Sequence, residues 1–163
     1  MKLSAASPAR PVERWDVRAT RHDEPDALAM QEQLSAVLLA RYGSDGKAGF
    51  AGPLPAGSVF AVAYDSQGVA AGCGAVRPLP GHEGCGEVKR MHASQPGRGI
   101  GAAVLDFLES QARAMGYREL KLSTRWANEG AIGFYRSRGF TVCEPFGSYV
   151  TRPECACLAK PLA

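Results

Sequence analysis

The sequence predicts a single domain of the mixed α/β (α+β) class. The chain has 163 residues, of which 45% are hydrophobic and 21% charged, so it can bury one sizeable core. Runs with the two-residue apolar period of strands alternate with runs that have the period of about 3.6 residues typical of helices. The most informative junction is the strand-like run at 87–93, which breaks into a glycine-rich turn that opens a helix.

The first elements follow from capping and breaking residues. A first strand is expected over 15–19. Asp23 as N-cap and Pro25 in the first turn predict a helix that continues to Tyr42, where Gly43 ends it. The residues expected on its inward face are Ala27, Met30, Leu34, Val37 and Leu38.

The following segment, 43–57, is rich in Gly, Pro and Ala and is expected to be a long exposed loop. Two strand-like runs, 58–64 and 69–77, then form a predicted hairpin across a short turn. A turn-like stretch leads from this hairpin to a central strand at 85–93. The strand before the glycine-rich turn is therefore expected to follow an antiparallel hairpin.

The helix after the glycine-rich turn has the clearest pattern in the chain. Its apolar residues recur at offsets of three and four, while Asp106, Glu109 and Arg113 fall off that stripe. The stripe consists of Gly101, Val104, Leu105, Leu108, Ala112 and Met115. Gly116 occupies the C′ position at which a helix commonly ends.

The C-terminal part is expected to complete the sheet. Alternation at 119–123 predicts a strand, and a second helix is expected over 128–138, with Gly139 as its stop. Residues 141–161 are expected to form a closing pair of strands, with 146–149 in their connection.

Composition narrows the function classes. A net charge of +3 without a Lys/Arg cluster argues against nucleic acid as a partner. No apolar stretch approaches the roughly 18 residues that span a bilayer and no signal-peptide core is present, so we expect a cytoplasmic protein without membrane contact. Five cysteines without a C-x-x-C pair indicate reduced thiols and no metal site. Residues 1–13 are expected to be a flexible tail before a domain at 14–163.

The glycine-rich turn predicts an anion site. Such a turn directs unpaired backbone N–H groups at one point, and together with the helix dipole they attract a pyrophosphate. Gly97, Gly99 and Ala102 also fit the G-x-G-x-x-G/A dinucleotide fingerprint. That fingerprint expects a parallel βαβ unit, whereas this turn follows a predicted antiparallel hairpin, so a Rossmann-like nucleotide binder is only a minor alternative.

Four segments, in the same order, resemble motifs of the GNAT superfamily of acetyl-CoA-dependent N-acetyltransferases; they are 87–91, 97–101, 128–131 and 134–140. The resemblance covers about residues 15–160. It implies a mostly antiparallel sheet of six or seven strands that is splayed at the cofactor site and has helices on both faces. It also implies transfer of an acetyl group from acetyl-CoA to a primary amine by direct attack on the thioester.

The resemblance further implies a cofactor site around the glycine-rich turn. In the family this turn holds the CoA pyrophosphate, the strand before it binds the pantetheine arm through its backbone, and Asn128 matches a residue that contacts the cofactor. The residues that the resemblance places at this site are Met91, His92, Ala93, Gly97, Arg98, Gly99, Ile100, Gly101, Ala102, Asn128, Ala131 and Phe134. A backbone N–H at Met91 is expected to stabilise the negative charge that develops on the thioester oxygen.

One position departs from the family pattern. Family members usually carry Arg or Gln three residues before the first of the two key glycines, where this chain has Pro96, which lacks an N–H donor. An alternative register takes Arg98 as that residue and Gly101 as the first glycine, but it displaces the helix pattern that follows. We therefore prefer Gly99 and Gly101 as the key glycines, and we expect Pro96 to weaken or rearrange the grip on pyrophosphate.

Two side chains are predicted to be catalytic. An acceptor amine is mostly ammonium at neutral pH, so a base must remove a proton before the nitrogen attacks. Glu87 matches the carboxylate that many family members use for this step, directly or through water; its alternative role is a structural pair with Lys89. Tyr135 is expected to protonate the departing thiolate, with core packing as its alternative role. His92 lies beside the expected acetyl site, but alternation places it on the opposite face from Glu87, and we favour a structural role for it.

The identity of the acceptor does not follow from the sequence. The resemblance places its site at the first helix, the following loop and the last two strands, which here include Tyr42, Phe146 and Tyr149, with Arg125 and Trp126 as walls of the cleft. A small-molecule amine is the expected substrate, a protein amine less so, and a homodimer remains open. The competing hypothesis is a non-catalytic acyl-CoA-binding or sensor module, motivated by the proline in the turn and its short connection.

Overall fold

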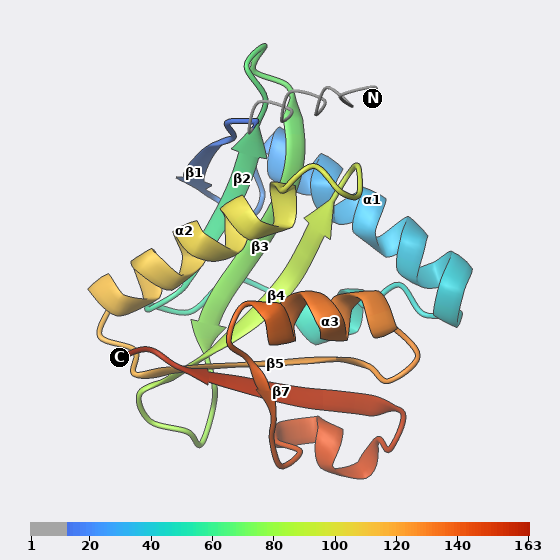
Figure 1. Ribbon diagram of the computed structural model, residues 1–163, viewed down its shortest axis with the longest axis vertical. Helices are drawn as coiled ribbons and strands as arrows, with labels where there is room; N and C mark the ends of the chain where they lie inside the picture. The colour runs from blue at the N-terminus through green and yellow to red at the C-terminus, as the bar shows by residue number, and fades with distance from the viewer. Residues whose placement is uncertain (1–12) are drawn as a thin grey trace, which may run out of the picture.

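The computed structural model describes residues 13–163, which form one seven-stranded sheet with three α-helices and two short 3₁₀ helices (Figure 1). The elements in chain order are β1 (Asp16–Thr20), α1 (Pro25–Tyr42), η1 (Lys47–Phe50), β2 (Val59–Tyr64), β3 (Ala70–Pro78), β4 (Cys85–Ala93), α2 (Ile100–Ala114), β5 (Glu119–Arg125), α3 (Glu129–Ser137), β6 (Thr141–Val142), η2 (Gly147–Thr151) and β7 (Cys155–Pro161). The predicted mixed α/β class is confirmed. Of the predicted tail, all but Glu13 lies outside the described residues.

The sheet divides between its two central strands. The strand order is β1-β2-β3-β4-β5-β7-β6, and each neighbouring pair is antiparallel except β4 with β5. These two strands pair at only three positions, of which the last is Glu87 opposite Lys121. Beyond it, β4 continues to Ala93 and β5 to Arg125 on diverging paths (Figure 1). The expected splay of a mostly antiparallel sheet is therefore confirmed.

The connection that begins with the glycine-rich turn joins two parallel strands, an arrangement that the sequence did not predict. β4 is antiparallel to β3, as predicted, but it is parallel to β5, and α2 forms the crossover between them. The turn thus lies in a short βαβ unit. The sheet still differs from a doubly wound dinucleotide-binding sheet, because its other neighbouring pairs are antiparallel.

Helices cover both faces of the sheet, as the resemblance implied. On one face Phe60 and Val62 of β2 pack with Ala27 and Met30 of α1. On the other face α2 and α3 cover a larger core (Figure 1). Its largest fully buried side chains are Val76, Ile100, Val104, Leu105, Leu108, Leu120, Leu122, Phe140 and Leu158.

The start of α1 differs from the sequence expectation. Its N-cap residue is Glu24, which makes no side-chain cap bond. The expected cap, Asp23, instead pairs with Arg21, whose Nη2 and Nε lie 2.7 and 3.0 Å from its two carboxylate oxygens. Val37, expected to face inward, is 38% exposed. At the other end, Gly43 terminates the helix in the left-handed conformation, as predicted.

α2 begins at Ile100 and is followed closely by Gly116 with φ = 89°, in agreement with the preferred register and the predicted stop. Glu109, expected off the buried stripe, is only 6% exposed, and its two oxygens lie 2.9 and 3.0 Å from Lys160 Nζ. The paired lysine offsets the desolvation of this carboxylate. Periodicity within the helix could not reveal a partner 51 positions away. Within residues 13–163, no helix combines the length and apolarity needed to cross a bilayer.

The segment 43–57 is more ordered than the exposed loop that its composition predicts. It contains the 3₁₀ helix η1, and Phe50 and Leu54 are partly buried against the core beneath α1. The Phe50 ring also lies under the Arg77 guanidinium, 5.6 Å from ring centroid to Cζ. Two apolar anchors thus hold this segment beside the open part of β4.

Candidate active site at the split between β4 and β5

A β-bulge in β4 organises the site. The register between β3 and β4 shifts after Cys73, so Arg90 and Met91 together oppose Gly74. Arg90 has φ = 57°, in the left-handed region that few non-glycine residues adopt. Gly74 leaves room for this arrangement, because a Cβ there would collide with Met91 Sδ. A bulge interrupts the hydrogen-bond ladder, and it coincides with the residue expected to present a free N–H, although that role of Met91 stays a prediction.

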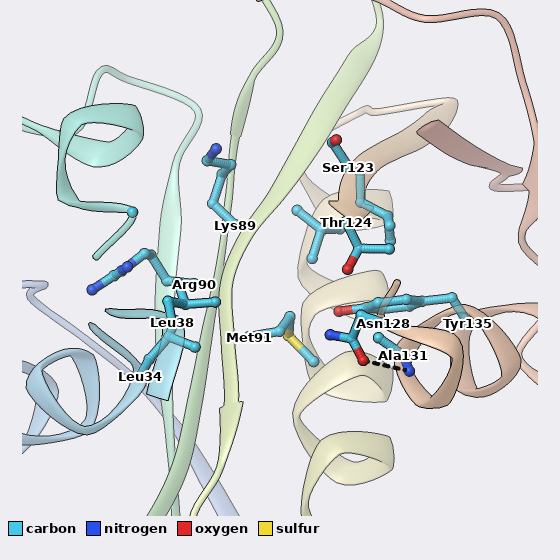
Figure 2. A pocket seen from close by; sticks show the side chains of 13 residues that line it. Leu34, Leu38, Lys89, Arg90, Met91, Ser123, Thr124, Asn128, Ala131 and Tyr135 are labelled. Atoms are coloured by element: carbon cyan, nitrogen blue, oxygen red, sulfur yellow. Dashed lines mark hydrogen bonds between the residues drawn. The ribbon is translucent and has the colours of Figure 1, made fainter. Parts of the chain in front are cut away.

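Arg90 fixes the bulge to α1. Its Nη2 donates to Ser35 Oγ at 2.7 Å and to Gln31 O at 2.9 Å, and its Nη1 donates to Asp45 O at 3.4 Å. Figure 2 shows this side chain turned toward α1 and away from Tyr135. Sequence analysis gave Arg90 no role, because the nearest of these partners is 45 positions away along the chain.

Because of the bulge, the side chain of His92 lies on a different face of β4 from the one expected. Because one extra residue is inserted after Glu87, His92 lies on the α1 face, where its Nε2 is 3.1 Å from Gln33 Oε1. Regular alternation along the strand predicts the opposite face from Glu87, and this prediction is wrong. Burial, with a smaller effect of Arg90, lowers the pKa of His92 below its usual value. A neutral imidazole is therefore expected at neutral pH.

A groove of about 700 Å³ runs between the end of β4, the glycine-rich turn and α3; we call it the cofactor groove. Its lining residues are Met91, His92, Ala93, Gln95, Pro96, Gly97, Gly99, Ile100, Gly101, Ala102, Gly130, Ala131, Phe134, Tyr135, Ser137 and Arg138. It thus contains every predicted cofactor-binding residue except Arg98 and Asn128.

The turn and the start of α2 offer backbone donors to this groove. Gly97 and Gly99 have φ of 76° and 77°, and the N-cap Gly99 has no side chain to bond the first turn. The Ala103 N–H bonds to Gly99 O at 3.0 Å, so by helix geometry the N–H groups before it lack helical partners. An extended pyrophosphate fits such a set of donors at a positive helix end. The residues present therefore suit an acyl-CoA.

Arg98 is turned out of the cofactor groove. Its guanidinium lies 2.6 Å from Glu13 Oε1, also bonds Gln95 Oε1, and stacks on Trp15 with Cζ 5.0 Å from the ring centroid. Trp15 Nε1 in turn donates to Arg98 O at 3.0 Å. The side chain therefore ties the glycine-rich turn to the segment before β1, and only its backbone remains available to a phosphate.

Tyr135 lies where the groove meets the split in the sheet. A second, central cavity of about 220 Å³ shares Met91, Ala131 and Tyr135 with the cofactor groove and extends between β4 and β5. In Figure 2 the Tyr135 hydroxyl and Met91 point toward each other across this cavity. Burial raises the pKa of Tyr135, so the phenol stays protonated at neutral pH.

Asn128 caps α3 with its side-chain oxygen, and its amide nitrogen keeps its donors. Its Oδ1 accepts the Ala131 N–H at 3.2 Å, which caps α3. The residue also lines the central cavity, and Figure 2 shows its amide nitrogen directed toward Met91. Capping thus leaves the amide N–H donors free to face a ligand.

A third cavity, of about 260 Å³, continues from the central one; we call it the acceptor cavity. The two share Leu38, Gly46, Lys89, Ser123, Thr124 and Asn128. The residues that line only the acceptor cavity are Tyr42, Ser44, Ala48, Gly49, Arg125, Tyr149, Arg152 and Cys155. Cofactor groove, central cavity and acceptor cavity thus form one path across the split.

Most of the expected acceptor residues lie on this path. Tyr42, Tyr149 and Arg125 line the acceptor cavity, together with residues of the segment after α1. Phe146 does not, because it is buried against Leu79, Cys85 and Cys157, where it supports Tyr149 with ring centroids 5.3 Å apart. Trp126 also lies outside the lining and is 49% exposed.

Glu87 forms an ion pair with a residue that the sequence did not indicate. Its Oε1 lies 3.0 Å from both Nε and Nη2 of Arg77 on β3, and the residue is only 3% exposed. The suggested pair with Lys89 is wrong, because Lys89 Nζ instead bonds Tyr149 Oη at 2.9 Å. Within residues 13–163 no side chain or backbone N–H donates to Oε2 of Glu87. Glu87 lines none of the three cavities, neither the cofactor groove nor the central cavity nor the acceptor cavity, so its action as a base stays a prediction.

Sequence analysis missed several residues of the path. Leu34 and Leu38 come from α1, Ser123 and Thr124 from the end of β5, and Lys89 from β4. Ser123 Oγ is buried without a hydrogen-bond partner among the described residues. The available signal was the position of Ser123 and Thr124 at the end of a strand that flanks the expected splay.

Comparison with known proteins yields a family match over most of the chain. Residues 15–140 match the model of the GNAT acetyltransferase family. Among curated proteins, the IAA acetyltransferase of Azospirillum brasilense is 40% identical over 105 residues, which cover 63% of this chain and 67% of that protein. The uncharacterized N-acetyltransferase YsnE of Bacillus subtilis is 35% identical over 94 residues, covering 56% and 62%. The chain thus matches about two thirds or less of these relatives.

Solved structures share the whole architecture. A Klebsiella pneumoniae protein assigned to the acyl-CoA N-acyltransferases superposes with a TM-score of 0.79 at 24% identity, covering 91% of this chain and 98% of that one. A GNAT-family acetyltransferase of Staphylococcus aureus gives a TM-score of 0.71 at 12% identity, covering 92% and 100%. At such identities these two structures establish the fold alone.

Proposed function

This chain belongs to the GNAT family of acetyltransferases, and from that premise we propose that it transfers the acetyl group of acetyl-CoA to the primary amine of a small molecule. The observation that carries the proposal is the continuous path through the split sheet, with Tyr135 at the meeting point of the cofactor groove and the central cavity. A donor on one side and an acceptor on the other would meet there. Proximity and orientation of this kind account for a large part of the rate enhancement of group transfer.

In the proposed reaction the amine nitrogen bonds the acetyl carbon, the carbon–sulfur bond breaks, and the sulfur takes a proton. The N–H groups of α2's first turn bind the pyrophosphate, and the bulge at Met91 presents a backbone donor to the developing oxyanion. Tyr135, whose hydroxyl faces the central cavity (Figure 2), is proposed to donate its proton to the departing CoA sulfur. Glu87 is proposed to take the amine proton through water at Oε2.

The proposal is tested with acetyl-CoA and a panel of small amines. We expect an acetylated product by mass spectrometry and an equal amount of free CoA thiol. Binding of acetyl-CoA without any product would instead support the non-catalytic acyl-CoA-binding module. Binding of NAD without binding of CoA would overturn the proposed cofactor.

The first expected result concerns the backbone of the turn. Acetyl-CoA at about one hundred times its Kd should stabilise the parent by roughly 2.7 kcal/mol, seen as a rise in Tm. Gly99→Val places a branched side chain at the N-cap of α2, where the phosphate must approach, and should abolish most of that rise.

Gly116→Val is the matched control, because Gly116 lies at the opposite end of α2 with a similar φ of 89° and an equally open surrounding. Both substitutions carry the same kind of backbone strain. The control should melt lower than the parent yet keep the full shift by acetyl-CoA. An intact shift in Gly99→Val would move the pyrophosphate site elsewhere.

A further inference from the structure

The acceptor cavity is lined by three cationic side chains. Lys89 comes from β4, Arg125 from the end of β5 and Arg152 from the segment before β7. Among the residues that the structure describes, no Asp or Glu lines this cavity. A small concave site with charges of one sign focuses a positive potential on whatever enters it.

Aromatic rings hold these cations in place. Arg125 stacks on Tyr42, with Cζ 4.7 Å from the ring centroid, and Arg152 lies 5.7 Å from that of Tyr149. Lys89 Nζ is 5.7 Å from the same Tyr149 ring and donates to its hydroxyl at 2.9 Å. Because their positions are fixed before a ligand arrives, little ordering is needed on binding.

Two of the three cations make no ion-pair contact with an acid among the described residues, although the nearby charge of Arg125 contributes, after a backbone hydrogen bond and Arg152, to lowering the pKa of Glu154. Arg152 pairs with Glu154, whose exposed carboxylate lies 3.1 Å from its Nε. Within residues 13–163, neither Arg125 nor Lys89 has a carboxylate at ion-pair distance. A cavity lined by cationic side chains and by no carboxylate is suited to bind an anionic group of a ligand.

The acceptor cavity is also small. Its volume of about 260 Å³ lies below the range of about 300 to 1,000 Å³ typical of pockets for drug-sized ligands. Its continuation through the central cavity leads toward Met91 and Tyr135. A ligand with its anion at Arg125 and Lys89 would therefore direct its other end toward the acetyl donor.

We propose that the acceptor is an amine that also carries a carboxylate, an amino acid or a compound of that type. Arg125 and Lys89 bind the carboxylate, and the amine points along the central cavity. This inference rests on the proposed acetyl transfer. Arg125 presents a planar fork that matches a carboxylate with two parallel hydrogen bonds, while Lys89 adds a point charge.

The same cations favour the reactive form of the amine. Nearby positive charge disfavours an ammonium, so a bound amine loses its proton more readily than it does in water. A diamine has no group to offset that repulsion, whereas an amino acid has its carboxylate. The charge distribution thus selects a zwitterion over a polycation.

The test compares free L-amino acids with the corresponding amino-acid amides and with 1,4-diaminobutane, following release of CoA thiol. We expect the best amino acid to exceed its amide in kcat/KM by at least about tenfold, the size of one charged contact. Arg125→Gln should raise the KM for the amino acid by about the same factor and change the kcat/KM of the amide much less, so that the preference for the amino acid falls. Arg118→Gln, just before the opposite end of β5, is the control and should behave as the parent.

Binding without turnover gives an independent measurement. In calorimetry without CoA, the N-acetylated form of the preferred amino acid should bind the parent and Arg118→Gln, and at least about tenfold more weakly to Arg125→Gln. Acetylation of 1,4-diaminobutane or the amides as fast as of amino acids would overturn the carboxylate site while leaving acetyl transfer intact. If no amine in the panel is acetylated, the proposed function fails, and calorimetry with the N-acetylated forms of the amino acids in the panel still decides whether the cavity binds a carboxylate.

Discussion

Tyr135→Phe should lower kcat by at least about tenfold, equivalent to about 1.4 kcal/mol of transition-state stabilisation, while Tm stays close to that of the parent. The ring packs against Phe134 and Phe140 with centroids 5.1 and 5.6 Å away, and phenylalanine retains those contacts. The Tyr135 hydroxyl faces the central cavity, so its removal should leave the packing of the ring intact. Steady-state kinetics measures the expected fall in kcat, and thermal unfolding of the same preparation measures whether Tm is unchanged.

Tyr117→Phe is the matched control and should show the reverse pattern. The Tyr117 hydroxyl donates to Gly57 O at 2.5 Å and does not line the cofactor groove, the central cavity or the acceptor cavity. Its removal should lower stability by about 1 kcal/mol and leave kcat unchanged. Parent-like turnover in Tyr135→Phe would remove Tyr135 from the mechanism and return it to the core.

The raised pKa of Tyr135 adds a pH criterion. Burial keeps the phenol protonated beyond the ordinary tyrosine value of about 10, so the O–H remains available throughout the neutral and mildly alkaline range. The kcat of the parent should therefore show no loss from tyrosine ionisation below about pH 10. A fall in kcat with an apparent pKa near 9 that vanishes in Tyr135→Phe would contradict this.

The elements that were predicted well are those with local signals. Gly43 and Gly116 mark helix ends in the left-handed region, and the apolar stripe of α2 is the buried side of that helix. The glycine-rich turn likewise marks the position of most of the cofactor groove. Each of these depends on backbone geometry or periodicity within one segment, which sequence carries directly.

The parts that were missed depend on contacts between distant segments. The bulge at Arg90 shifts the faces of β4 and so places His92 on the same side as Glu87, which regular alternation cannot foresee. Arg77 reaches Glu87 from the neighbouring strand, and Lys89 turns instead to Tyr149, 60 positions away. Pairings of this kind follow from strand register, which the sequence did not determine.

Glu87→Gln should lower kcat by about a hundredfold or more while leaving the affinity for acetyl-CoA nearly unchanged, because a base acts on the acceptor. The defect should shrink as pH rises, since more of the free amine is then already neutral. Glu87 lies on the same face of β4 as Lys89, which lines the acceptor cavity, two residues further along the strand. Rates measured from neutral to alkaline pH, with acetyl-CoA binding followed separately, provide the measurement.

Comparison with Arg77→Gln distinguishes the loss of the base from the loss of the ion pair between Arg77 and Glu87. Both substitutions delete the pair between Arg77 and Glu87, so both variants should melt below the parent. Only Glu87→Gln removes the carboxylate that accepts the proton, whereas Arg77→Gln retains it with Oε2 in place. A much larger loss of kcat in Glu87→Gln than in Arg77→Gln therefore identifies the base. Equal and small losses of kcat in the two variants would show that Glu87 only holds Arg77 in place. The positively charged lining of the acceptor cavity would then favour the uncharged amine without a protein base.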